Sequence, residues 1–219
     1  MDVTVAALMT APRYECVQAR NGIELALSKA GVPLTISGGV YYHQCMESML
    51  EDVVGKGIDY ALTVDFDSVF TADHVTRLIS IVSQEEKIDA LAAIQPMRGK
   101  GRVLGSVSKE SSVQWNGYPI QVDTAHFGLT VIDLKKLAEV PQPWFLSTPD
   151  SDGRWGDGCI DADVSFWRKW QDAGCSVYLD PGARLGHLEE MVTVFDREMN
   201  KQHVYYSEWS ANSQHTVDQ

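Results

Sequence analysis

The sequence predicts an α/β fold with a mostly parallel central sheet flanked by helices. Short apolar and β-branched runs, typical of strands buried inside a parallel sheet, recur along the first half of the chain. Between them lie longer segments whose apolar residues return at helical spacing. A chain of 219 residues, 44% of them hydrophobic, can form one substantial core. We therefore expect a single domain over residues 1–205 and a loose tail over residues 206–219.

The first half of the chain alternates between the two kinds of element. We expect strands where apolar runs stop at loops, and helices where apolar residues recur every three or four positions. The expected strands cover residues 3–8, 33–37, 60–64 and 90–94. The expected helices cover residues 16–30, 44–54 and 71–82. This order predicts β-α-β units with parallel strands.

The second half is less regular. Residues 95–123 are rich in Gly, Ser and basic side chains, so we expect a flap or a small antiparallel excursion there. The later elements are expected to be a strand over residues 126–132, a short helix over 133–138, a polar loop over 147–158, a helix over 161–174 and a strand over 176–179. The long late helix is marked by an apolar face of Val164, Phe166, Trp167 and Trp170.

Composition excludes several classes of protein. The formal net charge of -12 argues against a protein that coats nucleic acid or an anionic membrane, because such binding depends on Lys and Arg. No run approaches the roughly 18 apolar residues of a membrane span. The four cysteines form no CxxC pair, so neither a zinc ribbon nor a disulfide scaffold is indicated. We expect a soluble cytoplasmic protein without a membrane partner, and the sequence leaves its oligomeric state open.

Two aspartates follow the expected strand over residues 60–64. In an open α/β sheet, ligands bind beyond the carboxyl ends of the strands, where Asp65 and Asp67 lie. Alternate residues of an extended segment point the same way, so both carboxylates are expected to approach one cation from the same side. Mg²⁺ or Mn²⁺ would accept these oxygens and share its other positions with phosphate and water. The alternative is that the carboxylates only stabilise the N-terminus of the following helix.

The order of motifs resembles a known family. Residues 161–166 (Asp-Ala-Asp-Val-Ser-Phe) open the late helix, Gly174 ends it, and residues 178–181 and 186–187 follow. This arrangement resembles the C-terminal signature of GT-A fold glycosyltransferases, in particular the large inverting nucleotide-sugar transferase family (family 2-like). The glycine-containing run 125–132 and the turn Pro-Trp-Phe at 143–145 are similar to further parts of that family. Together with Asp-Phe-Asp at 65–67, the resemblance covers residues 3–190.

The resemblance implies a metal-dependent transfer of a sugar from a nucleoside-diphosphate sugar, with UDP as the favoured nucleotide. It implies a Mn²⁺ or Mg²⁺ ion held by Asp67 and His187, with Asp65 contacting the metal or the ribose. Imidazole is a competent ligand for Mn²⁺. Phe66 and Gly128 belong to the implied nucleotide-sugar site.

The general base implied by the resemblance is Asp163. In inverting members an aspartate at the start of the late helix removes the proton of the acceptor hydroxyl. The family has Glu-Asp here, whereas this chain has Ala162 and Asp163, so Asp161 or Asp157 is an alternative base. A plainer interpretation is that Asp161 and Asp163 only place negative charge at a helix N-terminus.

The loop after the first expected strand corresponds to the family's nucleotide site. Thr10, Pro12, Arg13 and Tyr14 lie there. The resemblance places Tyr14 for stacking on the base and Arg13 for reaching a phosphate. A simple surface turn is the alternative.

Two further segments are candidates for substrate contacts. Arg98, Lys100 and Arg102 are candidates for a flap over the diphosphate, with a solvated loop as the alternative. Trp155 lies in a glycine-rich loop and is expected to form a platform for an acceptor, with Asp157 beside it.

The sequence does not identify the acceptor. A glycan, a small metabolite and a hydroxymethylated DNA base all remain open. Asp65-Phe66-Asp67 also resembles the nucleophile loop of haloacid-dehalogenase-like Mg²⁺-dependent phosphatases, but that loop normally follows the first strand. A non-catalytic carbohydrate-binding module is a third interpretation, and it has no use for paired aspartates.

Overall fold

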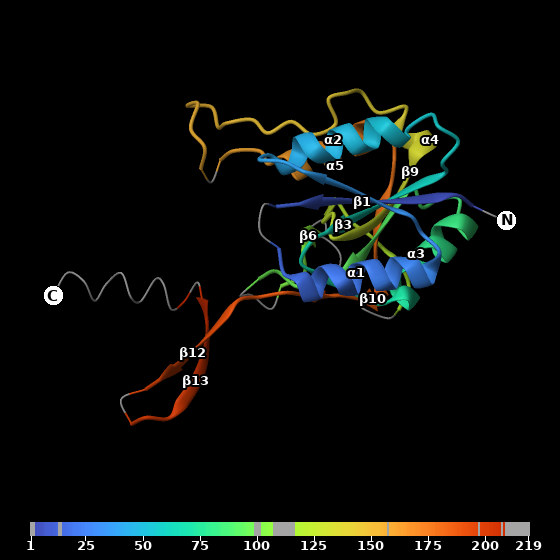
Figure 1. Cartoon of the computed structure of the whole chain (residues 1–219). Coiled ribbons are helices and arrows are strands. Elements are labelled where there is room, and N and C mark those ends of the chain that lie inside the picture. Colours follow the sequence, from blue (N-terminus) through green and yellow to red (C-terminus); the bar gives the residue numbers. More distant parts are fainter. Residues whose placement is uncertain are drawn as a thin grey trace.

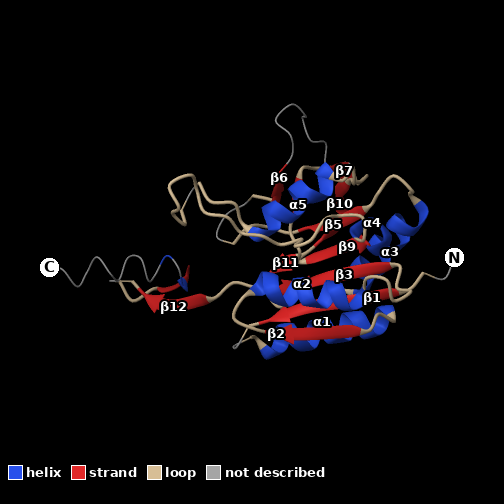
Figure 2. Ribbon diagram, turned by 90° about the horizontal axis from the view of Figure 1, so that it is seen from above, coloured by secondary structure: helices blue, strands red, loops and turns tan. Residues whose placement is uncertain are grey.

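A seven-stranded sheet in the order β2-β1-β3-β9-β5-β10-β7 forms the centre of the computed structural model (Figure 2). The structure describes residues 3–12, 15–98, 102–106, 117–156, 158–196, 198–206 and 208. The strands of this sheet are β1 (Val5–Ala11), β2 (Leu34–Gly38), β3 (Tyr60–Asp65), β5 (Ala90–Ile94), β7 (Ile120–Gln121), β9 (Leu129–Asp133) and β10 (Val177–Arg184).

The predicted α/β fold with a mostly parallel sheet is confirmed. β1 runs parallel to β2 and β3, and β10 runs parallel to β5. β9 lies antiparallel between β3 and β5, and β7 is antiparallel at the edge. The carboxyl ends of β1 and β3 therefore lie side by side, with Thr10 paired to Asp65.

Helices cover both faces of the sheet (Figure 1). One face carries α1 (Val17–Ala30) and α3 (Ala72–Gln84), and the other carries α2 (Tyr42–Val53), α4 (Leu134–Leu137) and α5 (Ala162–Asp172). Strand alternation explains the two layers, because Leu8 packs into one hydrophobic cluster while its neighbour Met9 packs into the other. No helix in the described part of the chain has the length and apolar character needed to cross a membrane.

Local chemistry sets two of the helix ends. Gly31 ends α1 in the left-handed region, at φ 72°, and its N–H donates to the carbonyl of Ser28. Asp133 begins α4, and its carboxylate accepts hydrogen bonds from the backbone N–H groups of Lys135 and Lys136 at 2.8 and 3.2 Å. The predicted helix over residues 16–30 is thus observed as Val17–Ala30.

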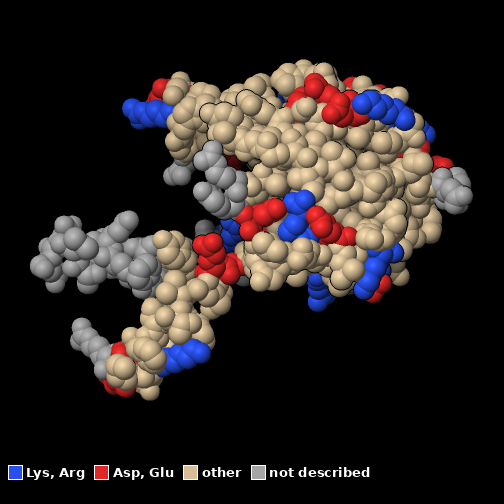
Figure 3. Space-filling view, in the orientation of Figure 1, with Lys and Arg blue, Asp and Glu red and all other residues tan. Residues whose placement is uncertain are grey.

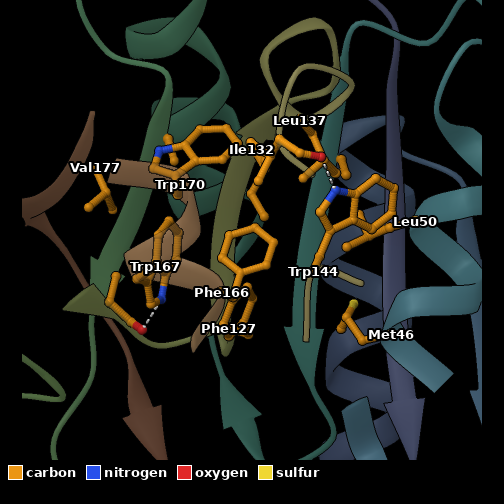
Figure 4. Close-up of a cluster of buried hydrophobic side chains, with 14 of the residues drawn as sticks. Met46, Leu50, Phe127, Ile132, Leu137, Trp144, Phe166, Trp167, Trp170 and Val177 are labelled. Carbon is orange, nitrogen blue, oxygen red and sulfur yellow. Dashed lines mark hydrogen bonds between the residues drawn. The ribbon is translucent and has the colours of Figure 1, made fainter. Parts of the chain in front are cut away.

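The aromatic face of α5 is the centre of one core layer (Figure 4). Phe166, Trp167 and Trp170 are fully buried, as the helical spacing predicted. Phe127 stacks on Trp167 with ring centroids 5.2 Å apart. The Trp167 indole N–H donates to the carbonyl of Ala125 at 2.6 Å, so its polar atom is satisfied inside the core. This bond joins α5 to the segment before β9.

β10 extends beyond its predicted end at residue 179. It continues to Arg184, with an irregularity between Asp180 and Arg184. Asp180 is fully buried, which its charge would ordinarily prevent. The guanidinium of Arg77 on α3 pairs with both of its oxygens, at 2.5 and 2.9 Å. This ion pair offsets the cost of burying the charge of Asp180 within the strand.

Three small antiparallel sheets complete the described structure. Two of them pair β4 (Ser68–Val69) with β11 (Gly186–His187) and β6 (Gly105–Ser106) with β8 (Thr124–Ala125). The latter fits the predicted antiparallel excursion. The third is a hairpin of β12 (Met191–Phe195) and β13 (Lys201–Tyr205), which projects from the body of the molecule (Figure 1) and was not predicted. Of the predicted tail, only residues 206 and 208 lie among those described.

Candidate functional site

The candidate site begins where β3 ends. Asp65 is the last residue of β3, and the chain turns at Phe66 and Asp67 before entering β4. The pairing of β4 with β11 sets His187 directly opposite Ser68. The backbone carbonyl of Asp67 also accepts a hydrogen bond from the N–H of Leu188 at 2.9 Å. Two segments about 120 residues apart are thus held together at the strand tip.

Asp67, His187 and Arg98 meet at this tip. Nε2 of His187 lies 3.3 Å from Oδ2 of Asp67, whose side chain is buried. The Arg98 guanidinium forms an ion pair with the same carboxylate oxygen, and its Nε donates to Nε2 of His187 at 3.0 Å. Oδ2 of Asp67 and Nε2 of His187 therefore both contact the Arg98 guanidinium.

The hydrogen bonds of His187 specify its tautomer. Nδ1 lies 2.9 Å from the carbonyl of Pro96 and donates to it, while Nε2 accepts from Arg98. The pKa of His187 is lowered, first by burial and also by the charge of Arg98. The imidazole is therefore neutral near pH 7 and presents the Nε2 lone pair beside Asp67, which is the form that binds metals.

This pair has the spacing of two neighbouring metal ligands. Adjacent ligands of an octahedral ion with bonds of about 2.1 Å lie about 3.0 Å apart. The separation of 3.3 Å between Asp67 Oδ2 and His187 Nε2 is close to that value. The Arg98 side chain, 56% exposed, supplies the positive charge at this position. Asp67 and His187 have the spacing and chemistry of two ligands of a divalent cation, and the other positions would be filled by groups outside this pair.

Asp65 does not join Asp67 and His187. Among the described residues, no group of three or more His, Cys, Asp or Glu side chains is arranged to hold a metal ion. The reason is the turn at Phe66 and Asp67, because the two-residue alternation of an extended strand does not continue through a turn. The expectation that both carboxylates face one cation from the same side rested on that alternation.

The carboxyl group of Asp65 is influenced by Asp163 as well as by Arg98. Burial raises its pKa to about 6, and the charge of Asp163 adds to the rise. The phenol of Tyr42, at the start of α2, has its pKa raised well above the ordinary value by burial and then by the charges of Asp65 and Asp163. The Tyr42 hydroxyl is buried and has no hydrogen-bond partner in the described structure. The carboxylates of Asp65 on β3 and Asp163 on α5 thus both raise the pKa of the buried Tyr42 hydroxyl.

The two aspartates at the start of α5 differ. Asp161 occupies the N-cap position but makes no capping hydrogen bond with its side chain. Asp163 lies in the first turn, and its pKa is raised by burial, with a further contribution from the charge of Asp161. A carboxylate whose pKa is raised is a stronger base than one with the ordinary pKa.

A buried polar layer lies behind the strand tip. Gly128 is closely surrounded, and a Cβ atom there would collide with Gln95 and approach His126 and Ser68. Its N–H donates to Nδ1 of His126 at 2.9 Å, while Nε2 of His126 donates to the carbonyl of Ala93 at 2.7 Å. The Gln95 amide donates to the Ser68 hydroxyl at 3.1 Å. Glycine at this position allows the layer to pack directly under Asp65, whose N–H donates to the Gly128 carbonyl at 3.2 Å.

Neutral His126 makes stability depend on pH. Burial lowers its pKa to about 4 from an ordinary 6.5. Between these values the unfolded chain binds a proton at His126 and the folded chain does not, so the stabilising contribution is complete above about pH 6.5 and is lost as pH falls toward 4. We expect the free energy of unfolding of the wild type to fall by about 2–3 kcal/mol more than that of His126→Gln between pH 7.5 and 4.5.

The measurement is denaturant unfolding of both proteins across this range. The comparison with His126→Gln is needed because Asp65, with its pKa raised to about 6, contributes in the opposite direction. Parallel pH curves for the two proteins would contradict a neutral, buried His126.

A cavity of about 730 Å³ opens beside Asp67. Its lining combines carboxylates, apolar groups and one guanidinium: Pro12, Glu15, Cys16, Phe66, Asp67, Arg98, Leu188, Glu189, Glu190, Tyr205 and Tyr206. Four of these described residues are acidic and Arg98 alone is basic. Figure 3 shows acidic side chains at the junction between the hairpin and the body of the molecule. The volume falls in the range of small-ligand sites.

The predicted site residues occupy several places. Pro12, Phe66 and Asp67 line the cavity, and Thr10 is buried beside Asp65. Trp155 is 67% exposed on the loop before α5, which extends from the same end of the sheet as the hairpin (Figure 1). Arg13, Tyr14, Lys100 and Asp157 lie outside the described residues.

Sequence reasoning missed some of the residues that the fold brings here. Tyr42 begins a helix distant in sequence from both Asp65 and Asp163, and no local pattern links them. Tyr205 and Tyr206 come to the cavity through the unpredicted hairpin. His126 was not among the predicted site residues, although its spacing of two residues from Gly128 was a usable signal.

Comparison with known proteins supports the fold. No family model matches the chain, and no curated protein matches its sequence. Among solved structures, "Crystal Structure of A197 from STIV" is similar with a TM-score of 0.61 and 14% identity, over 91% of this chain and 93% of that one. "Crystal structure of GalNAc-T7 with UDP, GalNAc and Mn2+" is similar with a TM-score of 0.56 and 11% identity, over 84% of this chain but 44% of that one. The chain thus spans under half of the GalNAc-T7 structure, and what the likeness shows is a GT-A-like fold.

Proposed function

We propose that this protein is a metal-dependent glycosyltransferase that moves a sugar from a nucleoside-diphosphate sugar to an acceptor hydroxyl. The observation that carries the proposal is the convergence of Asp67 and His187 on one positive group at the mouth of the cavity. A similar structure that was solved with UDP, GalNAc and Mn²⁺ supports UDP as the first nucleotide to test. The family 2-like assignment within the GT-A fold is part of this proposal.

The charge of the cavity supports a need for a cation. A diphosphate is an anion, yet four carboxylates and one guanidinium line the described part of the cavity. Like charges at this range repel, so binding requires added positive charge. A bound Mn²⁺ or Mg²⁺ would offset the charge of the leaving diphosphate. Asp67 and His187 are the residues that would hold it.

Arg98 and Asp65 have separate roles in this proposal. Arg98 pairs with Asp67 in the ligand-free protein and is exposed enough to turn to the diphosphate oxygens, where a guanidinium binds in a bidentate manner. Of the two roles predicted for Asp65, we favour a contact with the ribose over direct ligation, because among the described residues no group of three possible ligand side chains brings Asp65 together with Asp67 and His187. Phe66, which lies between Asp65 and Asp67 in the sequence, lines the cavity.

Asp163 is the proposed general base. It takes the proton of the acceptor hydroxyl while the hydroxyl oxygen bonds to the anomeric carbon and the bond to the diphosphate breaks. Its raised pKa suits this role. Asp161 and Asp157 remain the alternative bases. Attack from the side opposite the diphosphate would invert the anomeric configuration.

The acceptor is proposed to bind near the exposed loop that carries Trp155. This loop and the β12–β13 hairpin, whose Tyr205 lines the cavity, extend from the same end of the sheet (Figure 1). An exposed indole is suited to stacking on a sugar or a base, so a glycan, a metabolite and a hydroxymethylated DNA base all remain acceptor classes. We assign catalysis to the predicted domain over residues 1–205 and extend it by one residue to Tyr206, which lines the cavity.

A panel of nucleotide-sugars tests the proposal. The protein is incubated with UDP-, GDP-, ADP- and CDP-linked sugars with Mn²⁺, with Mg²⁺ and with chelator, and released nucleoside diphosphate is measured. We expect slow, metal-dependent hydrolysis of one nucleotide class. Cleavage of simple phosphate esters instead would favour the phosphatase interpretation, and sugar binding without any donor cleavage would favour a binding module.

A further inference from the structure

We propose that the base of the β12–β13 hairpin completes the donor site, with Tyr205 and Tyr206 forming an aromatic wall against the nucleobase. The inference rests on the proposed function and names the part of the donor that this wall recognises. Both tyrosines line the same cavity as Asp67 and Arg98. The cavity therefore has a charged end at the strand tip and an aromatic side at the hairpin.

Backbone hydrogen bonds fix the wall relative to Asp67. The N–H of Tyr206 donates to the carbonyl of Glu190 at 3.0 Å, and Tyr205 pairs with Met191 in the hairpin register. Two residues before Glu190, the N–H of Leu188 donates to the carbonyl of Asp67 at 2.9 Å. The wall is thus connected to the proposed metal site through a short segment that is anchored at both ends.

The chemistry of this aromatic wall suits a nucleobase rather than a phosphate group. Tyr205 and Tyr206 are 36% and 49% exposed, so part of each side chain remains available to a ligand. Among the described lining residues, the hairpin and the segment leading to it contribute Leu188, Glu189, Glu190 and the two tyrosines, and no basic side chain. Acidic groups repel a diphosphate, whereas aromatic rings stack on the flat face of a base. The diphosphate then lies toward Arg98.

The exposure of the hairpin is consistent with a ligand-binding role at the end where it joins the body of the molecule. A two-stranded hairpin is marginally stable by itself, and this one has large exposed apolar side chains such as Phe195 and Met199. Figure 1 shows it extending away from the sheet. A ligand held between its base and the body would add contacts at the point where the hairpin is attached.

The test compares a ligand that carries a nucleobase with one that carries none. UDP and inorganic diphosphate, each with Mn²⁺, are titrated calorimetrically into the full-length wild type, the double variant Tyr205→Ala/Tyr206→Ala, and the control Phe195→Ala. Phe195 is an aromatic residue of the same hairpin, is 63% exposed, and does not belong to the described cavity lining. We expect the double variant to bind UDP about 10-fold or more weakly, with diphosphate affinity and the control unchanged.

Each outcome supports or overturns a stated claim. Unchanged UDP affinity in the double variant, or an equal loss for UDP and diphosphate, would overturn the nucleobase contact. If the wild type binds none of UDP, GDP, ADP and CDP with Mn²⁺, the proposed function itself fails. If the wild type binds UDP and Asp67→Ala does not, while the tyrosine variant binds normally, the proposed function stands and this inference fails.

Discussion

Replacing Asp67 by alanine is expected to weaken Mn²⁺-dependent binding of UDP by more than about 100-fold. Loss of a residue that only orients a metal ligand costs about 10- to 100-fold in affinity, so loss of a direct ligand costs more. The variant also removes the carboxylate that pairs with Arg98 and faces His187. Titration of UDP in the presence of Mn²⁺, and again with chelator, measures the effect.

A matched control separates this loss from unfolding. Asp73→Ala makes the same chemical change at an exposed position in the first turn of α3, outside the described cavity lining. It should bind UDP as the wild type does. Melting curves of both variants show whether each remains folded. A folded Asp67→Ala protein with wild-type affinity would remove Asp67 from the proposed metal site.

Replacing Asp163 by asparagine should leave UDP binding intact and reduce sugar transfer by about 10²- to 10⁴-fold. This is the usual contribution of a general base, and asparagine keeps the shape of the side chain while removing its basicity. The reaction is followed with whichever donor and acceptor pair the nucleotide-sugar panel identifies. Asp172→Asn, at the exposed end of the same helix, is the control and should retain full activity.

The pH profile adds a readout that a structural role would not change. With Asp163 as base, transfer should decline as pH falls through its raised pKa, because the protonated carboxyl cannot accept a proton. The variant should lack this decline. Full transfer activity in Asp163→Asn would move the base to Asp161 or Asp157.

The strands and helices of the sheet could be predicted because each has a core face. The predicted strand over residues 60–64 is observed as Tyr60–Asp65, and the predicted helix over residues 71–82 as Ala72–Gln84. The hairpin was not predicted because neither of its faces is packed into the core. Met191 and Phe195, on one face of β12, are each more than half exposed, and Val192 and Val194, on the other face, are only partly buried.

The site was predictable in part. The strand tip carries Asp65 and Asp67 as expected, and His187 lies beside Asp67 as the family resemblance implied. The separation of Asp65 from this pair was not predictable from spacing, because the direction of a side chain after a strand depends on the turn that follows. The approach of Tyr42 and Asp163 to Asp65 depends on how α2 and α5 pack, which no local pattern records. Metal binding by Asp67 and His187 and the general-base role of Asp163 remain predictions.

The pairing of β4 with β11 has a consequence for how the protein is made. Asp67 and His187 meet across about 120 residues of intervening chain, so closing this contact is entropically costly and late in folding. A nascent chain on the ribosome brings Asp67 and His187 together only after residue 187 has emerged. Under the proposed function, fragments that stop before β11 should therefore lack metal-dependent ligand binding.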